Sequence, residues 1–326
     1  MTAVTAVALG AALALTACGS GQVGSTGGGT AKAAPTNKNI VYIPGDIEPF
    51  YTSIRCAAQA EGKKLGYKVT MQGPKTFSAD AQTPIVNAVA NNKPAGVLIA
   101  PTDDTAMANP IKSLTSAGSK VVEVDTALKD SSITESSISS NNIQGGTVAA
   151  DTLAKLVNGK KGSVLVLNTV AGTSTTDQRE QGFVAEVKKK YPNLTILPQQ
   201  YTQNDPAQAS QILTQVLSAH PDLVGVFATN LQTGQGAGSA LQGAGKRGKV
   251  SLVGFDASPQ EVQQLQQGVF QALIAQDPAK IGIDGVDQVV NAIKGKPVTK
   301  KISTNLVSIT QSDKAAIGRY EYKSHC

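Results

Sequence analysis

The 326-residue sequence contains no tryptophan, and aromatic residues make up only 4% of it. Apolar residues still reach 40%, so the hydrophobic cores must be built mainly from Ala, Val, Ile and Leu. A chain of this length exceeds the usual size of one core, so we expect two domains. The few aromatic side chains therefore stand out as candidates for a specific role.

Histidine is also scarce, with two residues, His220 and His325, far apart in the chain. Their spacing fits no metal site, and the sequence has no G-x-S-x-G, H-E-x-x-H or P-loop motif. The glycine-rich stretch 234–239 lacks the third glycine of a dinucleotide-binding turn. We therefore expect a protein that is not an enzyme and that uses no cofactor and no metal.

Basic residues outnumber acidic ones, 29 to 23, which gives a formal charge of +6. The lysine runs at 188–190 and 300–301 are short and have no aromatic residues between the charges, unlike a nucleic-acid-binding surface. We expect solvated helix ends and loops here, and no nucleic-acid partner.

The first 17 residues carry no charge and are apolar over about 15 residues, which is typical of an export signal and too short to span a bilayer. No Lys or Arg precedes the apolar run. The segment ends in Leu15-Thr16-Ala17-Cys18-Gly19, which resembles the lipobox of bacterial lipoproteins. This resemblance implies a signal peptide over 1–17, a lipidated Cys18 and, over 18–38, a flexible tether rich in Gly, Ser and Thr. It implies an exported protein anchored to the outer face of the cell membrane.

Two cysteines remain if Cys18 is acylated, Cys56 and Cys326. An exported chain permits a disulfide between them. The alternative is that Cys56 packs inside the first helix while Cys326 stays unpaired on the C-terminal tail. The sequence favours neither arrangement.

Short β-branched runs alternate with helical patterns from residue 39 onward. Strands are predicted at 39–44, 67–71, 96–100, 120–124, 164–167, 194–197, 225–229, 251–254 and 270–275. Helices are predicted at 51–65, 81–91, 143–157, 178–191, 207–219 and 278–293. The fold class is therefore α/β, with two doubly wound parallel sheets.

Polar and aromatic residues follow the predicted strands, where open parallel sheets bind their ligands. The candidates read in this way are Glu48, Phe50, Tyr51, Asp125, Thr126, Arg179, Asn230, Asp256 and Gln276. Arg179 is expected to open a helix, and the other residues follow strands. Together they predict a polar cleft.

At this point the chain resembles the ribose- and galactose-type periplasmic binding proteins of bacterial sugar importers, over about residues 39–310. The resemblance rests on Pro49-Phe50-Tyr51, Ala100-Pro101-Thr102-Asp103, Asp125, Asn142-Ile143-Gln144-Gly145-Gly146, Arg179-Glu180-Gln181-Gly182-Phe183, His220-Pro221-Asp222, Gly254-Phe255-Asp256 and Gln276. It implies a type I Venus flytrap: an N-terminal lobe of 39–140 plus 277–303 and a C-terminal lobe of 141–276 plus 304–326. Three hinge crossovers are expected, near Ser140, Gln276 and Ser303. The implied function is a monomeric solute-binding protein that closes on a small sugar or polyol and delivers it to an ABC transporter permease.

The aromatic and charged candidates each have two interpretations. Phe50 and Tyr51 can stack on the C–H face of a sugar, or pack the start of a helix into its lobe. Asp125, Arg179 and Asp256 can make charge-assisted hydrogen bonds to hydroxyls, or form a salt bridge between the lobes.

The two amide candidates differ in how far they are tied to ligand binding. Asn230 and Gln276 both donate and accept, which suits sugar hydroxyls. Gln276 has the alternative of a hinge hydrogen bond, because it coincides with a predicted crossover.

Four positions depart from the ribose-type pattern. Glu48 stands where Asn is usual, Thr126 where Arg is usual, Asn204 where an aromatic residue is frequent, and Leu231 where Asp is common. Asn204 thereby joins the candidate ligand-binding residues. The pocket has lost one cation and one stacking face, which makes an acyclic polyol a credible ligand and ribose a poor one.

Two other functions use this core fold. A sensory receptor for a small signalling carbohydrate, such as an autoinducer-2-type molecule, would need no different binding residues. A sugar-responsive repressor would need a helix-turn-helix before the core, where this chain has an apolar segment and a glycine-rich one.

Overall fold

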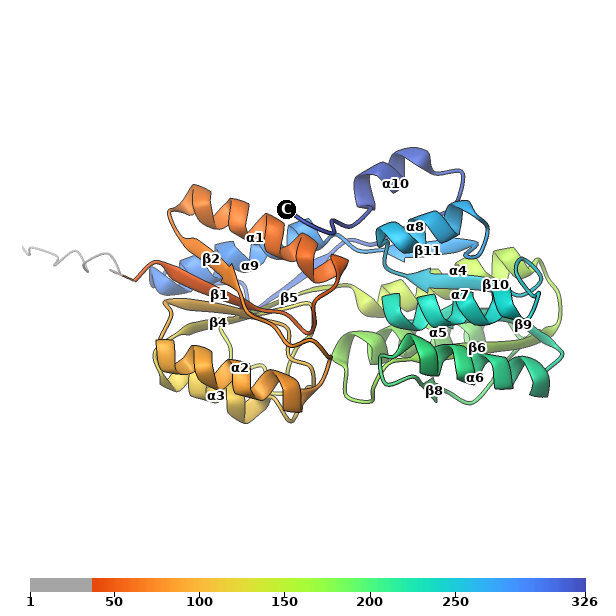
Figure 1. Ribbon diagram of the computed structural model, residues 1–326, viewed down its shortest axis with the longest axis horizontal. Coiled ribbons are helices and arrows are strands. Elements are labelled where there is room, and N and C mark those ends of the chain that lie inside the picture. The colour runs from red at the N-terminus through yellow and green to blue at the C-terminus, as the bar shows by residue number, and fades with distance from the viewer. Residues whose placement is uncertain (1–36) are drawn as a thin grey trace, which may run out of the picture. The chain divides into compact units, whose positions relative to one another are not determined.

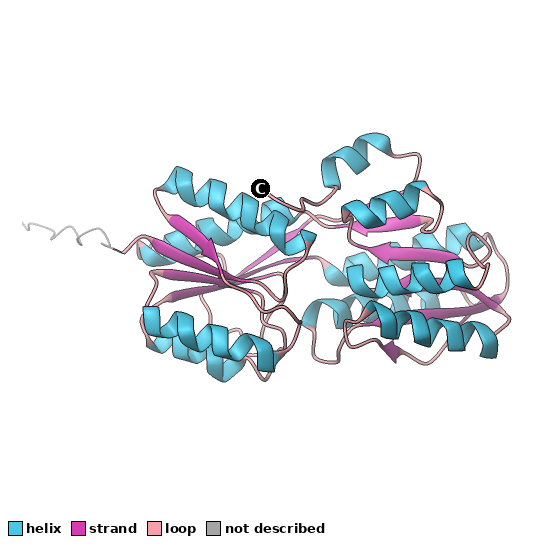
Figure 2. Cartoon of the chain, viewed as in Figure 1, coloured by secondary structure: helices cyan, strands magenta, loops and turns pink. Residues whose placement is uncertain are grey.

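Strands and helices alternate along the whole described chain, residues 37–326, of the computed structural model (Figures 1 and 2). The predicted signal peptide, Cys18 and all but the last two residues of the predicted tether lie outside the described residues. The described strands form two sheets, the number that the sequence predicted. The predicted α/β class with two doubly wound sheets is confirmed.

The first sheet contains β1 (Asn39–Ile43), β2 (Lys68–Met71), β3 (Gly96–Ile99), β4 (Lys120–Val124), β5 (Ser136–Ser140) and β12 (Lys301–Thr304). All pairs are parallel, in the order β12-β5-β4-β3-β1-β2. Four helices cover it: α1 (Pro49–Leu65) and α9 (Pro278–Ile293) on one face, α2 (Ala79–Asn92) and α3 (Ala108–Ser116) on the other (Figure 1). We call this sheet and its four helices the first lobe.

The second sheet contains β6 (Gly162–Asn168), β7 (Leu194–Ile196), β8 (Gln200–Tyr201), β9 (Leu223–Ala228), β10 (Ser251–Phe255), β11 (Ala272–Ala275) and β13 (Val307–Ile309). The order is β13-β11-β10-β9-β6-β7, with β8 also on β6, and only the β11–β13 pair is antiparallel. Its helices are α4 (Asn142–Val157), α5 (Ser174–Lys190), α6 (Pro206–Ala219), α7 (Leu231–Gly243), α8 (Pro259–Gln266) and α10 (Lys314–Tyr320). We call these elements the second lobe.

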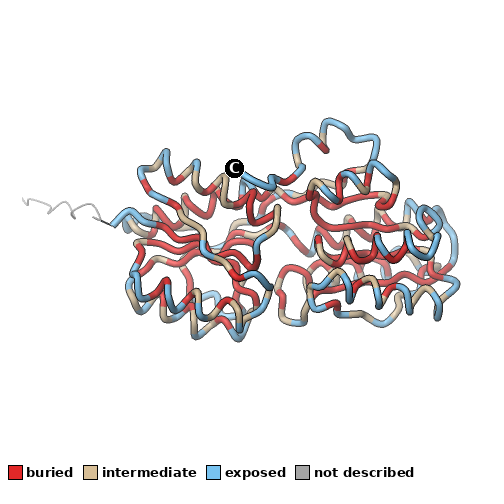
Figure 3. Tube along the Cα trace, viewed as in Figure 1, coloured by how far each residue is buried: buried red, intermediate tan, exposed pale blue. Residues whose placement is uncertain are grey.

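Helices cover both faces of each sheet, so the central strands are buried on both sides (Figure 3). Every residue of β3 and of β6 is buried. Of the described helices, none is both long and apolar enough to cross a membrane.

Local signals fix where several helices begin. Proline occupies the first turn of α1, α6, α8 and α9, where its missing N–H costs nothing. A polar side chain directly before each of these helices accepts backbone N–H groups of the first turn. These N-cap residues are Glu48, Asp205, Ser258 and Asp277.

The chain passes between the lobes at three places. It leaves the first sheet after Ser140, returns after Ala275, and leaves it again between Thr304 and Val307. These crossovers lie at or within three residues of the positions that the sequence predicted. Gln276 Oε1 accepts a hydrogen bond from Ser140 Oγ at 2.8 Å, so two of the crossovers are joined directly.

The last residues of the chain do not stay with the second lobe, to which 304–326 was assigned. Cys326 forms a disulfide with Cys56 in α1, and the backbone N–H of Lys323 donates to Ser53 Oγ at 2.7 Å. The tail therefore crosses back to the first lobe, and the C-terminus lies beside α1 (Figure 1).

Candidate functional site

A small cavity of about 40 Å³ lies between the two lobes, at the carboxyl ends of their strands. It is lined by all ten residues that the sequence singled out: Glu48, Phe50, Tyr51, Asp125, Thr126, Arg179, Asn204, Asn230, Asp256 and Gln276. The structure thus brings together side chains that are up to 228 positions apart, from Glu48 to Gln276.

Asp125 and Asp256 occupy equivalent places in the two lobes. Each directly follows a strand, β4 or β10, and each donates its backbone N–H to the neighbouring strand, to Ile138 O at 2.8 Å and to Ile274 O at 2.9 Å. Both have left-handed backbones, with φ of 70° and 91°. Such a conformation costs a non-glycine residue free energy, and outside helix ends it is often found at functional sites. Here it occurs where both carboxylates line the cavity.

The Asp256 carboxylate is held by three donors. Oδ1 accepts from Gln276 Nε2 at 2.7 Å and from the hydroxyl of Tyr322 at 3.1 Å, and Oδ2 accepts from the backbone N–H of Leu231 at 3.2 Å. Gln276 therefore combines the two roles considered for it, a hinge hydrogen bond and a place in the site. It bonds the crossover at Ser140 and also orients a carboxylate of the cavity.

Arg179 is 2% exposed and lies in the second turn of α5. It does not open the helix as predicted, because the polar run Ser174-Thr175-Thr176 forms the first turn instead. Its guanidinium carbon lies 3.6 Å from the centre of the Phe255 ring, while Nε donates to Asn142 Oδ1 at 2.9 Å and Nη1 donates to Thr229 O at 2.8 Å.

The predicted alternative of a salt bridge finds no support among residues 37–326. Arg179 takes part in none of the ion pairs within 4.0 Å there, and its Nη2 makes no hydrogen bond to the described residues. The neighbouring contacts fix the plane of the guanidinium and leave donors for a ligand in the cavity.

Two glycines, one in α4 and one in α5, allow the helix that carries Arg179 to pack closely against α4. A Cβ atom on Gly146 of α4 would overlap the carbonyl of Arg179, and one on Gly182 of α5 would overlap the carbonyl of Ile143. The two helices therefore cross with backbone nearly touching backbone, which side chains at these positions would prevent. The motifs at 142–146 and 179–183 therefore depend on each other, because each supplies a glycine to this crossing.

The start of α1 forms the wall contributed by the first lobe. Glu48 accepts hydrogen bonds from the backbone N–H groups of Phe50 at 2.7 Å and Tyr51 at 3.2 Å, so it caps the helix as well as lining the cavity. The hydroxyl of Tyr51 donates to Asp125 Oδ2 at 2.9 Å. Phe50 and Tyr51 are nearly buried, in edge-to-face contact 5.2 Å apart. This pair therefore packs the start of α1 into the first lobe and also lines the cavity.

Amides close the opposite side of the cavity. Asn230 Nδ2 donates to Asn204 Oδ1 at 2.7 Å, and Asn204 Nδ2 donates to Asp46 Oδ2 at 3.3 Å. Gln232 Nε2 also donates to Asp46 Oδ2 at 3.3 Å. Since Asp46 belongs to the first lobe and the amides to the second, these bonds hold the lobes together across the cavity.

Burial raises the pKa of the carboxyls around the cavity. The pKa rises from 3.8 to about 7 for Asp46 and to about 6 for Asp125, because desolvation disfavours the charged form; a hydrogen bond from Asn204 moderates the first and the Arg179 charge the second. Burial also raises the pKa of Glu48 and Asp256. The cavity holds four carboxyls and one guanidinium, and is therefore rich in hydrogen-bond acceptors.

The family model for the periplasmic binding protein domain matches residues 40–297. The chain belongs to this family. The ribose import binding protein RbsB of Escherichia coli is 32% identical over 264 residues, which cover 79% of this chain and 85% of that one. RbsB of Bacillus subtilis is 29% identical over 263 residues, covering 81% and 84%.

Solved structures agree with this assignment. An ABC transporter solute-binding protein from Agrobacterium vitis, bound with alpha-D-tagatopyranose, has a TM-score of 0.85 and 37% identity, and the match covers 87% of this chain and 99% of that one. A carbohydrate transporter solute-binding protein from Agrobacterium radiobacter, in complex with D-arabinose, has a TM-score of 0.82 and 29% identity over 87% and 99%. The predicted resemblance to sugar-binding members of the family is confirmed, and the fold is the Venus flytrap.

Several cavity residues of this periplasmic binding protein were outside the predicted set. Asp46, two residues before Glu48, lines the cavity without having been predicted, and so do Phe77, Thr173 and Gln232. Asp46 Oδ1 and the Oγ1 atoms of Thr126 and Thr173 are buried without a hydrogen-bond partner among the described residues. Unsatisfied polar atoms at a cavity wall mark positions where a ligand hydroxyl can bind.

Proposed function

We propose that this chain is the extracytoplasmic solute-binding protein of an ABC importer, and that the ten predicted residues that line the cavity bind a monosaccharide or a sugar alcohol. The observation that carries the proposal is the cavity itself, in which carboxylates, a guanidinium and amides from both lobes surround one small space. Relatives named as ribose import binding proteins and as solute-binding proteins with bound sugars support it.

The donors and acceptors suit hydroxyl groups. A hydroxyl donates once and accepts twice, so it can bond a carboxylate such as Asp125 and the guanidinium of Arg179 together. Charge-assisted hydrogen bonds of this kind contribute about 1.5–3 kcal/mol each. A few of them, with contacts to Phe50 and Tyr51, suffice for the ~8 kcal/mol of micromolar binding.

A sugar alcohol is included because of position 204. The amide of Asn204 is engaged with Asn230 and Asp46, so position 204 offers hydrogen bonds where an aromatic ring is frequent in the ribose-type pattern. A ligand that needs little ring stacking fits this position better than a flat sugar ring does.

Binding is proposed to work by lobe closure without chemistry on the ligand. The two lobes, divided as 39–140 plus 277–304 and 141–276 plus 307–320, turn about the three crossovers, and Asp46 meets Asn204 and Gln232 when they close. A ligand with contacts to both lobes binds the closed state more tightly and shifts the population toward it. The closed monomer is then the form that an ABC permease receives.

Anchoring through Cys18 belongs to the same proposal. A lipid on this residue would hold the binding domain at the outer face of the membrane through the tether of residues 18–38. In cells fed a palmitate analogue, the chain should carry label that Cys18→Ala removes. Label that persists in the variant would contradict the anchor.

The ligand is tested by a thermal-shift screen of the purified chain with pentoses, hexoses and their sugar alcohols, followed by calorimetry. Ligand at a hundredfold its Kd should add about 2.7 kcal/mol of stability. The matched comparison is Asp256→Asn, which should show a clearly smaller shift at the same concentration, about 1.4 kcal/mol for a tenfold weaker Kd. If a folded, ligand-free protein responds to none of these compounds, the proposed ligand class is wrong.

A further inference from the structure

The last six residues, 321–326, form a segment that we call the C-terminal strap. It leaves α10 in the second lobe, and its backbone bonds both lobes: Tyr322 N–H donates to Ala257 O at 2.9 Å in the second, and Lys323 N–H donates to Ser53 Oγ at 2.7 Å in the first. The disulfide from Cys326 to Cys56 ends the strap on α1.

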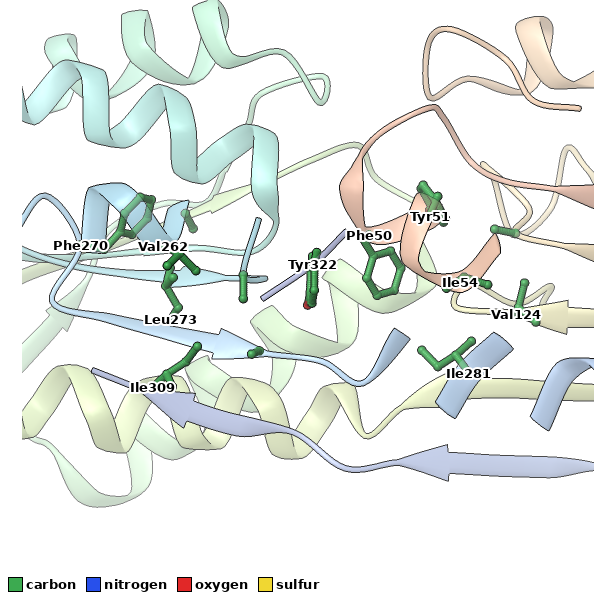
Figure 4. Close-up of a cluster of buried hydrophobic side chains, with 14 of the residues drawn as sticks. Phe50, Tyr51, Ile54, Val124, Val262, Phe270, Leu273, Ile281, Ile309 and Tyr322 are labelled. Atoms are coloured by element: carbon green, nitrogen blue, oxygen red, sulfur yellow. The ribbon is translucent and has the colours of Figure 1, made fainter. Parts of the chain in front are cut away.

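Tyr322 is the side chain of the strap that reaches the site. It is 3% exposed, although residues 323–326 after it are all exposed. Its ring lies 5.6 Å from that of Phe50, which lines the cavity, and Figure 4 shows it beside Phe50 among buried side chains that include Leu273 and Ile309. The strap thus places an aromatic ring directly behind the wall of the cavity.

The hydroxyl of Tyr322 makes two bonds to site residues. It donates to Asp256 Oδ1 at 3.1 Å and accepts from the backbone N–H of Gln276 at 3.0 Å. Since Gln276 Nε2 donates to the same Oδ1 at 2.7 Å, the three groups form a closed hydrogen-bonded triangle. Tyr322 does not line the cavity, so it acts on the ligand through Asp256 and not by contact.

An exposed chain end of this length would ordinarily fray, because few bonds oppose its conformational entropy. Beyond Tyr322, the bond of Lys323 N–H to Ser53 and the disulfide are what hold the strap to α1. The disulfide joins Cys56, two turns after Glu48 in sequence, to a residue four positions after Tyr322. It therefore restrains the approach of Tyr322 to Asp256.

We propose that Tyr322 is a positioning residue of the binding site, which sets the orientation of Asp256 and Gln276, and that the Cys56–Cys326 disulfide keeps it there. This rests on the proposed function, because Asp256 is taken as a ligand-binding carboxylate. Ligand affinity then depends on a residue and a disulfide that do not touch the ligand.

The first test compares Tyr322→Phe with Tyr320→Phe. The first variant removes the hydroxyl and keeps the ring, whereas Tyr320, two residues earlier, makes no hydrogen bond through its hydroxyl to the described residues and serves as control. Affinity for the sugar or polyol identified in the screen should fall about fivefold in Tyr322→Phe, the value of one ordinary hydrogen bond, and stay unchanged in Tyr320→Phe. Equal affinity in all three proteins would overturn the proposal.

A pH profile separates positioning from a general structural role. The hydroxyl lowers the pKa of Asp256, so in Tyr322→Phe the loss of binding on the acid side should begin at higher pH than in the wild type. Other charged and titratable groups that act on Asp256 are Arg179 of α5, Glu261 of α8, and Asp46, Glu48 and Asp125 from the first lobe. These groups are the same in the wild type and in Tyr322→Phe, so they do not alter the difference between the two proteins in the pH at which binding is lost. An unchanged acid limb would contradict the role.

The second test replaces both cysteines, Cys56→Ser with Cys326→Ser, in the full chain. We expect weaker binding, by up to the same factor of about five, through a faster dissociation rate. Adding Tyr322→Phe to this variant should weaken binding less than it does in the wild type, because both changes act on one interaction. Fully independent effects would show that the disulfide does not hold Tyr322 in place.

Hydrogen exchange of the ligand-free proteins tests the proposal independently of the ligand. The backbone N–H of Gln276 bonds Tyr322, and that of Leu231 bonds Asp256, so both should exchange faster in Tyr322→Phe and in the double cysteine variant. If no carbohydrate binds but exchange accelerates, the proposed function fails while the positioning role stands. Unaltered exchange at both amides would overturn the positioning role itself.

Discussion

The guanidinium of Arg179 lies on the ring of Phe255, with its carbon 3.6 Å from the ring centre, and two of its nitrogens are bonded to Asn142 and Thr229. A planar, delocalised cation is needed for this combination, because an ammonium group can neither stack nor donate in a fixed plane. Phe255 itself belongs to an aromatic cluster, with Phe227 6.5 Å away. The cation of the site is thus positioned by the core of the second lobe.

Arg179→Lys should therefore behave as a loss of function even though it keeps the charge. We expect ligand affinity to fall at least about tenfold, as for other buried arginines at binding sites. Calorimetry on the wild type and the variant measures this. The control is Arg319→Lys in α10, an exposed arginine that does not line the cavity. Full affinity in Arg179→Lys would mean that only the charge matters.

Asp256→Asn should weaken binding at least about tenfold, because it removes the negative charge that strengthens hydrogen bonds to hydroxyls. Asparagine tolerates the left-handed backbone observed at this position, so the strand end should keep its shape. The comparison is Asp130→Asn, an exposed carboxyl outside the cavity. Retained affinity in Asp256→Asn would remove this carboxylate from the site.

The sequence predicted most of the fold because the periodicity of buried β-branched runs is strong. The strand at Lys120–Val124 and the helix at Pro278–Ile293 were predicted to the residue. The helix α7 was missed, because the sequence Leu-Gln-Thr-Gly-Gln-Gly-Ala-Gly has low intrinsic helix propensity. The helix forms because Gly236 packs closely against the backbone of Pro206. This is a tertiary contact, which local sequence patterns do not show.

The site was predictable only in part, for a physical reason. Residues that follow strands, such as Asp125 and Asp256, share one edge of a parallel sheet, and this rule found them. Tyr322 follows no strand, and it reaches Asp256 only because a disulfide turns the tail back toward α1. The sequence left that disulfide open, so no local pattern could place Tyr322 near the cavity.

Stability without ligand should decrease as pH rises through the acidic range. Folding raises the pKa of Asp125 from 3.8 to about 6 and that of Asp46 to about 7, so the folded state binds more protons than the unfolded state between these values. Their contribution is complete below pH ~4 and is lost as pH approaches ~7. The Tm of the ligand-free protein should therefore be higher at pH 5 than at pH 7.5, and Asp46→Asn with Asp125→Asn should reduce the difference. The same pH dependence in the double variant would contradict the assignment.

The disulfide should contribute strongly to stability, because it closes a long loop: Cys56 and Cys326 have a sequence separation of 270. Removal of a disulfide generally costs about 2–5 kcal/mol, and the denatured chain gains most freedom when the loop is long. Denaturant unfolding of Cys56→Ser with Cys326→Ser, beside the oxidised wild type, measures the difference. Equal free energies of unfolding would mean that the cross-link does not constrain the denatured chain.

Gly146→Ala should damage both stability and binding, because the added methyl group would overlap the backbone carbonyl of Arg179. The α4–α5 contact cannot absorb this by rotating a side chain, since the obstructing atoms belong to the backbone, so α5 must shift. Overpacking of this kind costs about 1–3 kcal/mol. The same shift moves the guanidinium of Arg179 out of its place on Phe255, so ligand affinity should fall together with stability.

The matched control for this prediction is Gly243→Ala at the end of α7, where an added methyl group meets no atom within 4 Å. Alanine favours a helix over glycine by about 1 kcal/mol, so this variant should be neutral or slightly stabilised, with unchanged affinity. Denaturant unfolding and calorimetry on both variants test the pair. If Gly146→Ala lowered stability but left affinity intact, Arg179 would not depend on the close crossing of α4 and α5. If it changed neither, the two helices would have room that their observed packing does not provide.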